Sequence, residues 1–254
     1  MVAARARCSI EAVLLEALHR HGLDPGDDIA VAYSGGPDST ALLAALCALR
    51  HRGGGSRARP LAVYVDHNLR ARSELDAELD IVRRNCSSLG ARLVVARVRP
   101  GRIAECAQTN GEGIEAEARR FRYYILRSLH DRESLKAILL AHTRDDQLET
   151  ILMRLLGGSG SAGIRGMPEF AGPFLRPFLA LEKSSLLQYL EAGNLGFSTD
   201  STNASTDYLR NKIRGELVPF LNSSFPGWRR GLARATAKAF EDDKALSSHA
   251  QSLC

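Results

Sequence analysis

The chain has 254 residues, which is enough for one large domain or for a domain with an appendage. Hydrophobic residues make up 44% of the chain and charged residues 25%, as in ordinary water-soluble proteins. No apolar run approaches the roughly 20 residues that cross a bilayer, and the first residues lack the apolar core of a secretory signal. These features argue against a membrane-spanning protein and predict a cytoplasmic location.

Five cysteines are spread widely along the chain: Cys8, Cys47, Cys86, Cys106 and Cys254. No two have the close spacing of a metal site, so the pattern favours free thiols over a structural zinc or an iron–sulfur cluster. The net charge of +5 and the pI near 9.1 would attract polyanions such as nucleic acids. A merely basic surface explains the same charge.

Helices and short apolar strands alternate along the first 156 residues. The sequence predicts helices over 9–21, 40–49, 74–89, 115–129 and 145–156, and strands over 29–33, 61–65, 93–98 and 137–141. Continuous apolar strands separated by helices are typical of a parallel sheet that is covered on both faces. We therefore expect a doubly wound α/β fold with a mostly parallel sheet.

The pattern changes after Gly157, where glycine and proline punctuate residues 157–177. Further helices are predicted over 182–192, 205–221 and 228–246. We expect a catalytic domain over residues 1–222, followed by a helical C-terminal extension over 223–254. That extension is too short for a second full domain.

A glycine-rich loop joins the first strand to the next helix, and its sequence is Ser34-Gly35-Gly36-Pro37-Asp38-Ser39. Glycines allow a sharp turn, and the free N–H groups and positive dipole end of the helix attract anions. This arrangement predicts a phosphate site, although an ordinary capped glycine turn is the simpler alternative. It is not the Gly-Lys-Ser/Thr type of loop, because no lysine follows the glycines. Since Asp38 would repel phosphates, the loop also predicts Mg²⁺ between the two.

Polar residues also gather where other predicted strands end. Asp66, His67 and Arg70 follow the second strand, and the stretch from His142 to Thr150 follows the fourth. In open parallel sheets, ligands bind at this edge. Asp146 and Glu149 share a helix face, although acidic residues in a first helical turn also complement the helix dipole.

The predicted helix over 115–129 begins with a run of charged residues: Glu115, Glu117, Arg119, Arg120 and Arg122. Arg119 and Arg122 are three residues apart, so both could reach a phosphate or RNA. A solvated charged face is the alternative.

The glycine loop resembles the PP-loop of ATP pyrophosphatases, and residues 28–222 are similar to the tRNA(Ile)-lysidine synthetase family. The matching segments are Val65–Arg70, Ala141–Thr150, Gly158–Met167, Arg176-Pro177, Asp200–Asn203 and Arg210–Arg214. A family tryptophan is replaced by Phe197 here. Many members carry additional C-terminal domains that help hold tRNA, and we expect this chain to be either a short form without them or a truncated one. The resemblance implies an adenine nucleotide alpha hydrolase-like fold.

The resemblance also implies a reaction. ATP adenylates the C2 oxygen of the wobble cytidine of tRNA(Ile), and free lysine then displaces AMP. It implies that residues Ser34–Ser39 bind ATP, that Asp38 orients Mg²⁺, and that Asp38, His142 and Asp146 are catalytic. The implied substrate and tRNA contacts are Asp66, His67, Arg70, Glu115, Arg119, Arg122, Asp145, Glu149, Arg210, Asn211 and Arg214. A homodimer is left open, and the sequence does not identify the residues that select lysine.

Two alternatives remain. A tRNA thiolase of the same PP-loop class would need catalytic or cluster-binding cysteines, and none of the five lies near a predicted strand end. A non-catalytic tRNA-binding relative would not need Asp38, His142 and Asp146, which are all present.

Overall fold

The computed structural model describes residues 2–53, 59–198 and 209–252. The chain divides into two compact units. The first comprises Met1–His142 and Glu169–Thr199, and the second comprises Thr143–Pro168 and Asp200–Cys254. Among the described helices, none is both long enough and apolar enough to cross a membrane.

The first unit contains a six-stranded sheet in the order β3-β2-β1-β4-β6-β5. Its strands are β1 (Ile29–Ala32), β2 (Leu61–Asp66), β3 (Arg92–Arg97), β4 (Ala137–Leu139), β5 (Phe170–Ala171) and β6 (Phe174–Leu175). All neighbouring pairs are parallel except β5 with β6. The mostly parallel sheet was therefore predicted correctly. The β5–β6 hairpin was missed, because strands of two residues carry no detectable periodicity.

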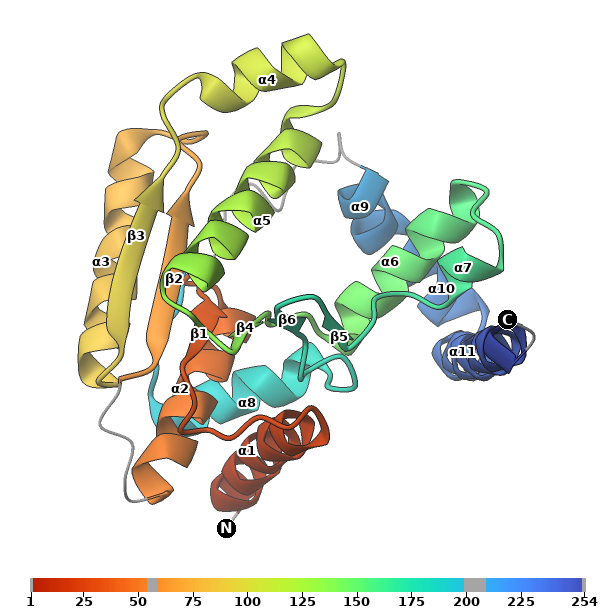
Figure 1. Ribbon diagram of the computed structural model, residues 1–254, viewed down its shortest axis with the longest axis horizontal. Coiled ribbons are helices and arrows are strands. Elements are labelled where there is room, and N and C mark those ends of the chain that lie inside the picture. The colour runs from red at the N-terminus through yellow and green to blue at the C-terminus, as the bar shows by residue number, and fades with distance from the viewer. Residues whose placement is uncertain (1, 54–58, 199–208, 253–254) are drawn as a thin grey trace. The chain divides into compact units, whose positions relative to one another are not determined.

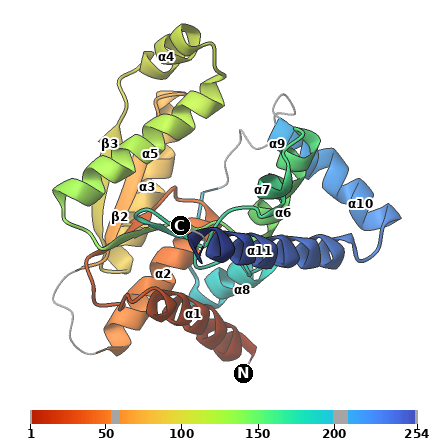
Figure 2. The same ribbon diagram turned by 45° about the vertical axis from the view of Figure 1, so that its right-hand side comes forward.

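Helices cover both faces of this sheet (Figures 1 and 2). The helices of the first unit are α1 (Val2–Arg20), α2 (Pro37–Arg52), α3 (Arg72–Ser88), α4 (Arg102–Asn110), α5 (Ile114–Arg132) and α8 (Lys183–Gly193). Val31 and Leu139 belong to the same core as residues of α1, α2, α3 and α8. Ala30 and Ile138, one residue away in each strand, pack with α5. This alternation confirms the doubly wound arrangement.

Helix α4 was not predicted from the sequence. Only Ile103 and Ala107 of its nine residues are buried hydrophobics, too few to form a clear apolar stripe. Gly101 and Gly111 flank the helix with φ of 78° and 65°. Glycine adopts these left-handed angles without steric cost, so the two residues fix where the helix begins and ends.

The second unit is helical. It contains α6 (Arg144–Leu156), α7 (Ser161–Ile164), α9 (Leu209–Lys212), a π-helical turn (Ile213–Leu217), α10 (Val218–Ser224) and α11 (Trp228–Ser252). The helix predicted over 205–221 is present from Leu209 onward, with the π-helical turn inside it. Its first residues and the Asp200–Asn203 motif lie outside the described residues.

Candidate nucleotide site

The glycine loop folds back onto the first turn of α2. The backbone N–H of Ser34 donates to Ser39 Oγ at 3.2 Å, and the two serine hydroxyls lie 3.1 Å apart. Thr40 Oγ1 donates to the carbonyl of Gly36, the N-cap residue of α2, at 2.8 Å. Pro37 occupies the first turn, where its missing N–H costs nothing. The start of α2 therefore lies at the loop, in the arrangement that an anion site requires.

Gly35 is required for this loop on two grounds. Its φ of +78° is rarely adopted by residues with a side chain, and a Cβ atom would lie 3.0 Å from Val82 Cγ2. Its carbonyl accepts a hydrogen bond of 2.8 Å from the backbone N–H of Ser198. The segment leading to Ser198 is held by Asn85, which donates to the Gly196 carbonyl at 2.7 Å and to the Tyr33 hydroxyl at 2.9 Å. The loop is thus fixed from α3 and from the segment after α8.

The loop lies at the point where the strand order reverses. β1 pairs with β2 on one side and with β4 on the other, so the connections that follow β1 and β4 leave the same edge of the sheet. Nucleotides bind outside such a switch point in open α/β sheets. The half-buried His142 follows β4 at this edge, as expected from the sequence.

Asp38 faces a lysine that sequence reasoning missed. Lys183 Nζ lies 3.5 Å from Asp38 Oδ2, and the two side chains are 36% and 20% exposed. Lys183 is the first residue of α8, so nothing in the local sequence links it to the loop. No group of three or more His, Cys, Asp or Glu residues that could hold a metal occurs in the described part of the chain. One carboxylate beside the glycine loop still fits Mg²⁺, which commonly binds through one or two carboxylates and the substrate's phosphates.

Asp66 is buried at the end of β2, where it shapes the following loop. Its Oδ1 accepts the N–H of Asn68 at 2.9 Å, and Arg72 approaches its Oδ2 at 3.3 Å. Asn68 has a φ of +50° and donates through its side chain to the Val98 carbonyl at 2.6 Å. These bonds explain why the position requires an aspartate even before any ligand is considered.

The other two candidates after β2 differ in their surroundings. Arg70 donates to the buried Glu78 at 2.6 Å, and Glu78 also accepts the Tyr64 hydroxyl at 2.7 Å. His67 is half-buried, and burial together with the charge of Arg122 lowers its pKa to about 4. His67 is therefore neutral at physiological pH. The structure brings together His67, which directly follows β2, and Arg122 of α5, a pairing that the sequence did not predict.

The other charged residues at the start of α5 are of two kinds, buried and exposed. Glu117 is buried and accepts bonds from Asn110 and Arg120, so it holds α4 to α5. Glu115 and Arg119 are exposed, and the Arg119 guanidinium lies 5.1 Å from the centre of the Tyr123 ring. Glu115 and Arg119 are therefore available to a ligand.

In the second unit, Asp146 caps the helix in which it lies. Thr143 is the N-cap residue of α6, and its backbone N–H and hydroxyl both donate to Asp146 Oδ2 at 2.9 Å. The other oxygen, Oδ1, lies 3.9 Å from Arg210 and 3.7 Å from Arg214. The capping box fixes the orientation of a carboxylate whose second oxygen faces positive charge.

Glu149 binds two of the four arginines that were predicted to contact RNA or phosphate. Arg214 donates to both of its carboxylate oxygens, at 2.7 and 2.8 Å, and Arg210 donates to Oε2 at 3.1 Å. Asp145 instead accepts a bond of 2.7 Å from Arg229, a residue that sequence reasoning did not identify. Asn211 is half-buried on the same short helix as Arg210.

The glycine and methionine at the end of the Gly158–Met167 motif are explained by Gln147. Its side chain donates to the Met167 carbonyl at 2.9 Å and accepts the Met167 N–H at 2.7 Å. A Cβ atom at Gly166 would lie 2.7 Å from Gln147 Oε1, and φ there is +68°. The motif therefore fixes the segment after α7 against α6.

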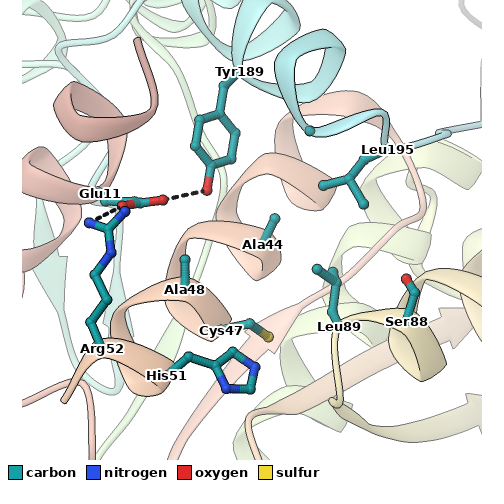
Figure 3. A pocket seen from close by; sticks show the side chains of 11 residues that line it. Glu11, Ala44, Cys47, Ala48, His51, Arg52, Ser88, Leu89, Tyr189 and Leu195 are labelled. Atoms are coloured by element: carbon teal, nitrogen blue, oxygen red, sulfur yellow. Dashed lines mark hydrogen bonds and ion pairs between the residues drawn. The ribbon is translucent and has the colours of Figure 1, made fainter. Parts of the chain in front are cut away.

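The first unit contains a cavity of about 350 Å³ that is separate from the candidate nucleotide site (Figure 3). It is lined by the later residues of α2, including Cys47 and His51, and shares no residue with the glycine loop. The buried Glu11 beside it accepts the Tyr189 hydroxyl at 3.1 Å and pairs with Arg52 at 2.5 Å. One carboxylate oxygen thus has a hydrogen bond and the other an ion pair within the protein.

A model of the PP-loop domain family matches residues 8–221. The chain belongs to the PP-loop domain family. Among curated proteins, it is 37% identical over 210 residues to tRNA(Ile)-lysidine synthase of Treponema pallidum (strain Nichols), covering 82% of this chain and 43% of that protein. It is 34% identical over 236 residues to the Bacillus subtilis protein of that name, covering 91% and 48%. The chain thus spans about half the length of the curated relatives it matches.

Among solved structures, the fold is similar to that of U34-tRNA thiolase NcsA from Methanococcus maripaludis with its [4Fe-4S] cluster. The TM-score is 0.74 at 16% identity, and the match covers 94% of this chain and 80% of that one. At this identity the likeness concerns the fold alone. The comparisons confirm the predicted family and fold class, and they support the expected use of ATP.

Proposed function

We propose that this chain carries the catalytic part of a tRNA(Ile)-lysidine synthetase. ATP would adenylate the C2 oxygen of the wobble cytidine in tRNA(Ile), and free lysine would then displace AMP. The observation that carries this proposal is a glycine loop that is fixed by hydrogen bonds at the sheet's switch point, in a chain whose relatives are named for this reaction. We place the reaction in the cytoplasm.

The glycine loop would bind the phosphates of ATP. The N–H groups at the start of α2 and the hydroxyls of Ser34 and Ser39 supply donors to phosphate oxygens. Asp38 would hold Mg²⁺ together with those phosphates, and the cation would neutralise charge that develops on them. Rigid donors help most because they need no rearrangement in the transition state.

Adenylation addresses the chemical difficulty of replacing a carbonyl oxygen. That oxygen is a poor leaving group, whereas AMP attached through it leaves readily. We assign His142 and Asp146, from their motif positions, to placing the cytidine or to accepting the proton of the lysine amine. His67 is neutral, so we assign it to base contact rather than to binding a phosphate.

The basic residues would hold the anticodon loop. We assign Arg119 and Arg122 of α5, and Arg210 and Arg214 of the second unit, to RNA or phosphate. Glu149 would hold the last two in place until RNA binds. The wobble base must turn out of its stack to react, as bases recognised in single-stranded RNA commonly do.

A thiolase is the nearest alternative, and the described cysteines argue against it. Cys47 and Cys86 are buried, and burial raises their pKa to about 12 and about 11. A thiol with so high a pKa forms little thiolate, which is the reactive and metal-binding form. In the described part of the chain, these two do not form a metal-binding group with Cys106.

Pyrophosphate release tests the proposal. The protein, tRNA(Ile) and ATP should release pyrophosphate, with product formation that requires lysine. Asp38→Ala should abolish the release while the thermal melt stays close to that of the unmodified protein. Dependence on a sulfur donor in place of lysine would favour thiolation, and no release from the intact protein would favour a non-catalytic tRNA binder.

A further inference from the structure

We propose that Lys183 binds the β- and γ-phosphates of ATP and then the pyrophosphate that leaves. This inference rests on the proposed function, because it assigns a leaving-group contact within the same nucleotide site. In that step a bond forms between the α-phosphorus and the C2 oxygen, and the bond from the α-phosphorus to the bridging oxygen breaks. Pyrophosphate leaves with the electron pair of the broken bond, so negative charge grows on it.

The packing of α8 directs Lys183 toward the loop. Leu186 and Leu190 of α8 are fully buried in the core that also contains residues of α2. Lys183 is three residues before Leu186, so the two share a helix face that is turned toward α2. Helix α8 lies beside α2 in both ribbon views (Figures 1 and 2). The lysine is therefore held beside the first turn of α2 by apolar contacts that do not depend on its charge.

The contact with Asp38 places the ammonium group at the start of α2, beside the proposed phosphate site. Its Nζ lies 3.5 Å from Asp38 Oδ2, and Asp38 is in the first turn of α2, directly after the glycines. A glycine loop of the Gly-Lys-Ser/Thr type carries a lysine that reaches the β- and γ-phosphates, and this loop contains no lysine. Here a lysine arrives from a segment far along the chain.

The two charged groups have complementary roles as the ligand binds. Without nucleotide, Asp38 and Lys183 neutralise one another. If Asp38 binds the cation that accompanies ATP, its attraction for the ammonium falls, and the phosphates then attract the ammonium instead. The Lys183 side chain is 36% exposed, and its ammonium group lies at the end of four flexible carbons. The ammonium group can therefore turn toward the phosphates without movement of α8.

A plain ion pair that holds α8 to α2 is the competing explanation, and the chain offers a matched control. Lys136 Nζ lies 2.6 Å from Asp27 Oδ1, and Lys136 directly precedes β4, at the amino edge of the sheet. Lys136→Met therefore removes a lysine–aspartate pair of the same unit without touching the phosphate loop.

The test measures binding of inorganic pyrophosphate with Mg²⁺, and of AMP, by calorimetry to the full chain. Lys183→Met should weaken pyrophosphate binding about tenfold or more, the usual scale for one charge-assisted contact, and leave AMP binding nearly unchanged. Lys183→Arg should restore most of the loss, and Lys136→Met should bind pyrophosphate like the unmodified protein. Lys183→Gln serves as a second variant if Lys183→Met does not fold.

Two outcomes would overturn the inference. One is pyrophosphate binding that is unchanged in Lys183→Met, and the other is an equal loss of pyrophosphate and AMP binding, which indicates a structural role. The assay contains neither tRNA nor lysine. If the chain did not form lysidine, the result of the pyrophosphate binding experiment would still hold. If Lys183 did not bind pyrophosphate, the proposal of lysidine formation would be unaffected.

Discussion

Removing the charge of Glu149 should lower the free energy of unfolding of the second unit. Its carboxylate is 5% exposed and accepts three bonds from Arg210 and Arg214. Breaking a fully buried ion pair costs about 3–5 kcal/mol. The two arginines are 24% and 36% exposed and can recover water, so we expect a cost of about 2 kcal/mol for Glu149→Gln. With a typical urea dependence of about 2 kcal/mol per molar, the unfolding midpoint should fall by about 1 M.

Trp228 makes this measurement specific to the second unit. It is the single tryptophan of the chain and lies at the start of α11, where its indole N–H donates to Asn222 at 2.9 Å. Urea unfolding followed by tryptophan fluorescence therefore reports on this unit. Glu216→Gln is the matched control, because Glu216 is exposed in the π-helical turn that contains Arg214. Equal midpoints for the two variants would refute the view that Glu149 organises the arginines.

Two further predictions concern the first unit. Because the folded-state pKa of His67 is about 4, below the ordinary 6.5, the unfolded chain binds the proton first. Stability should therefore fall as pH drops from about 6.5 to 4, by up to about 3 kcal/mol. Urea melts of His67→Asn should show a weaker loss, and an unchanged pH dependence would contradict the assignment. Gly35→Ala should cost about 1–2 kcal/mol and weaken ATP binding, because its Cβ would crowd Val82. Gly22→Ala is the control, because Gly22 also has a positive φ but a Cβ atom there would have no neighbour within 4 Å. Calorimetry should find the ATP affinity of Gly22→Ala unchanged. An equal loss of ATP affinity in the two variants would contradict the crowding argument.

The sequence predicted those parts of the fold that are encoded locally. β1, β2, β3 and β4 were recognisable because each is a continuous apolar run, and α6 because its apolar residues follow a helical period. The β5–β6 hairpin and α4 were missed because two-residue strands and a nine-residue helix with few buried positions carry little pattern.

In the candidate site, too, the residues that follow strands were predictable, and the pairs between distant segments were not. The glycine loop and His142 follow strands, and the topology of a parallel sheet brings such residues to one edge. The pairing of Lys183 with Asp38, or of Arg229 with Asp145, depends on helix packing between distant segments. No local spacing signals such pairs.

Some predicted ligand contacts have partners within the protein. Arg70 bonds Glu78, and Asp66 shapes its own loop, so their types are explained by the fold alone. Residue type at a strand end does not distinguish a group that builds the site from one that touches the ligand. Contact with tRNA by these residues stays a prediction.

Mass analysis of tRNA(Ile) tests the central claim most directly. After incubation of the full chain with ATP, Mg²⁺ and lysine, the anticodon fragment should gain one lysine with loss of one water, at the wobble cytidine. The gain should be absent when ATP or lysine is omitted. An unchanged mass, or the exchange of an oxygen for a sulfur when a sulfur donor is supplied, would contradict the account.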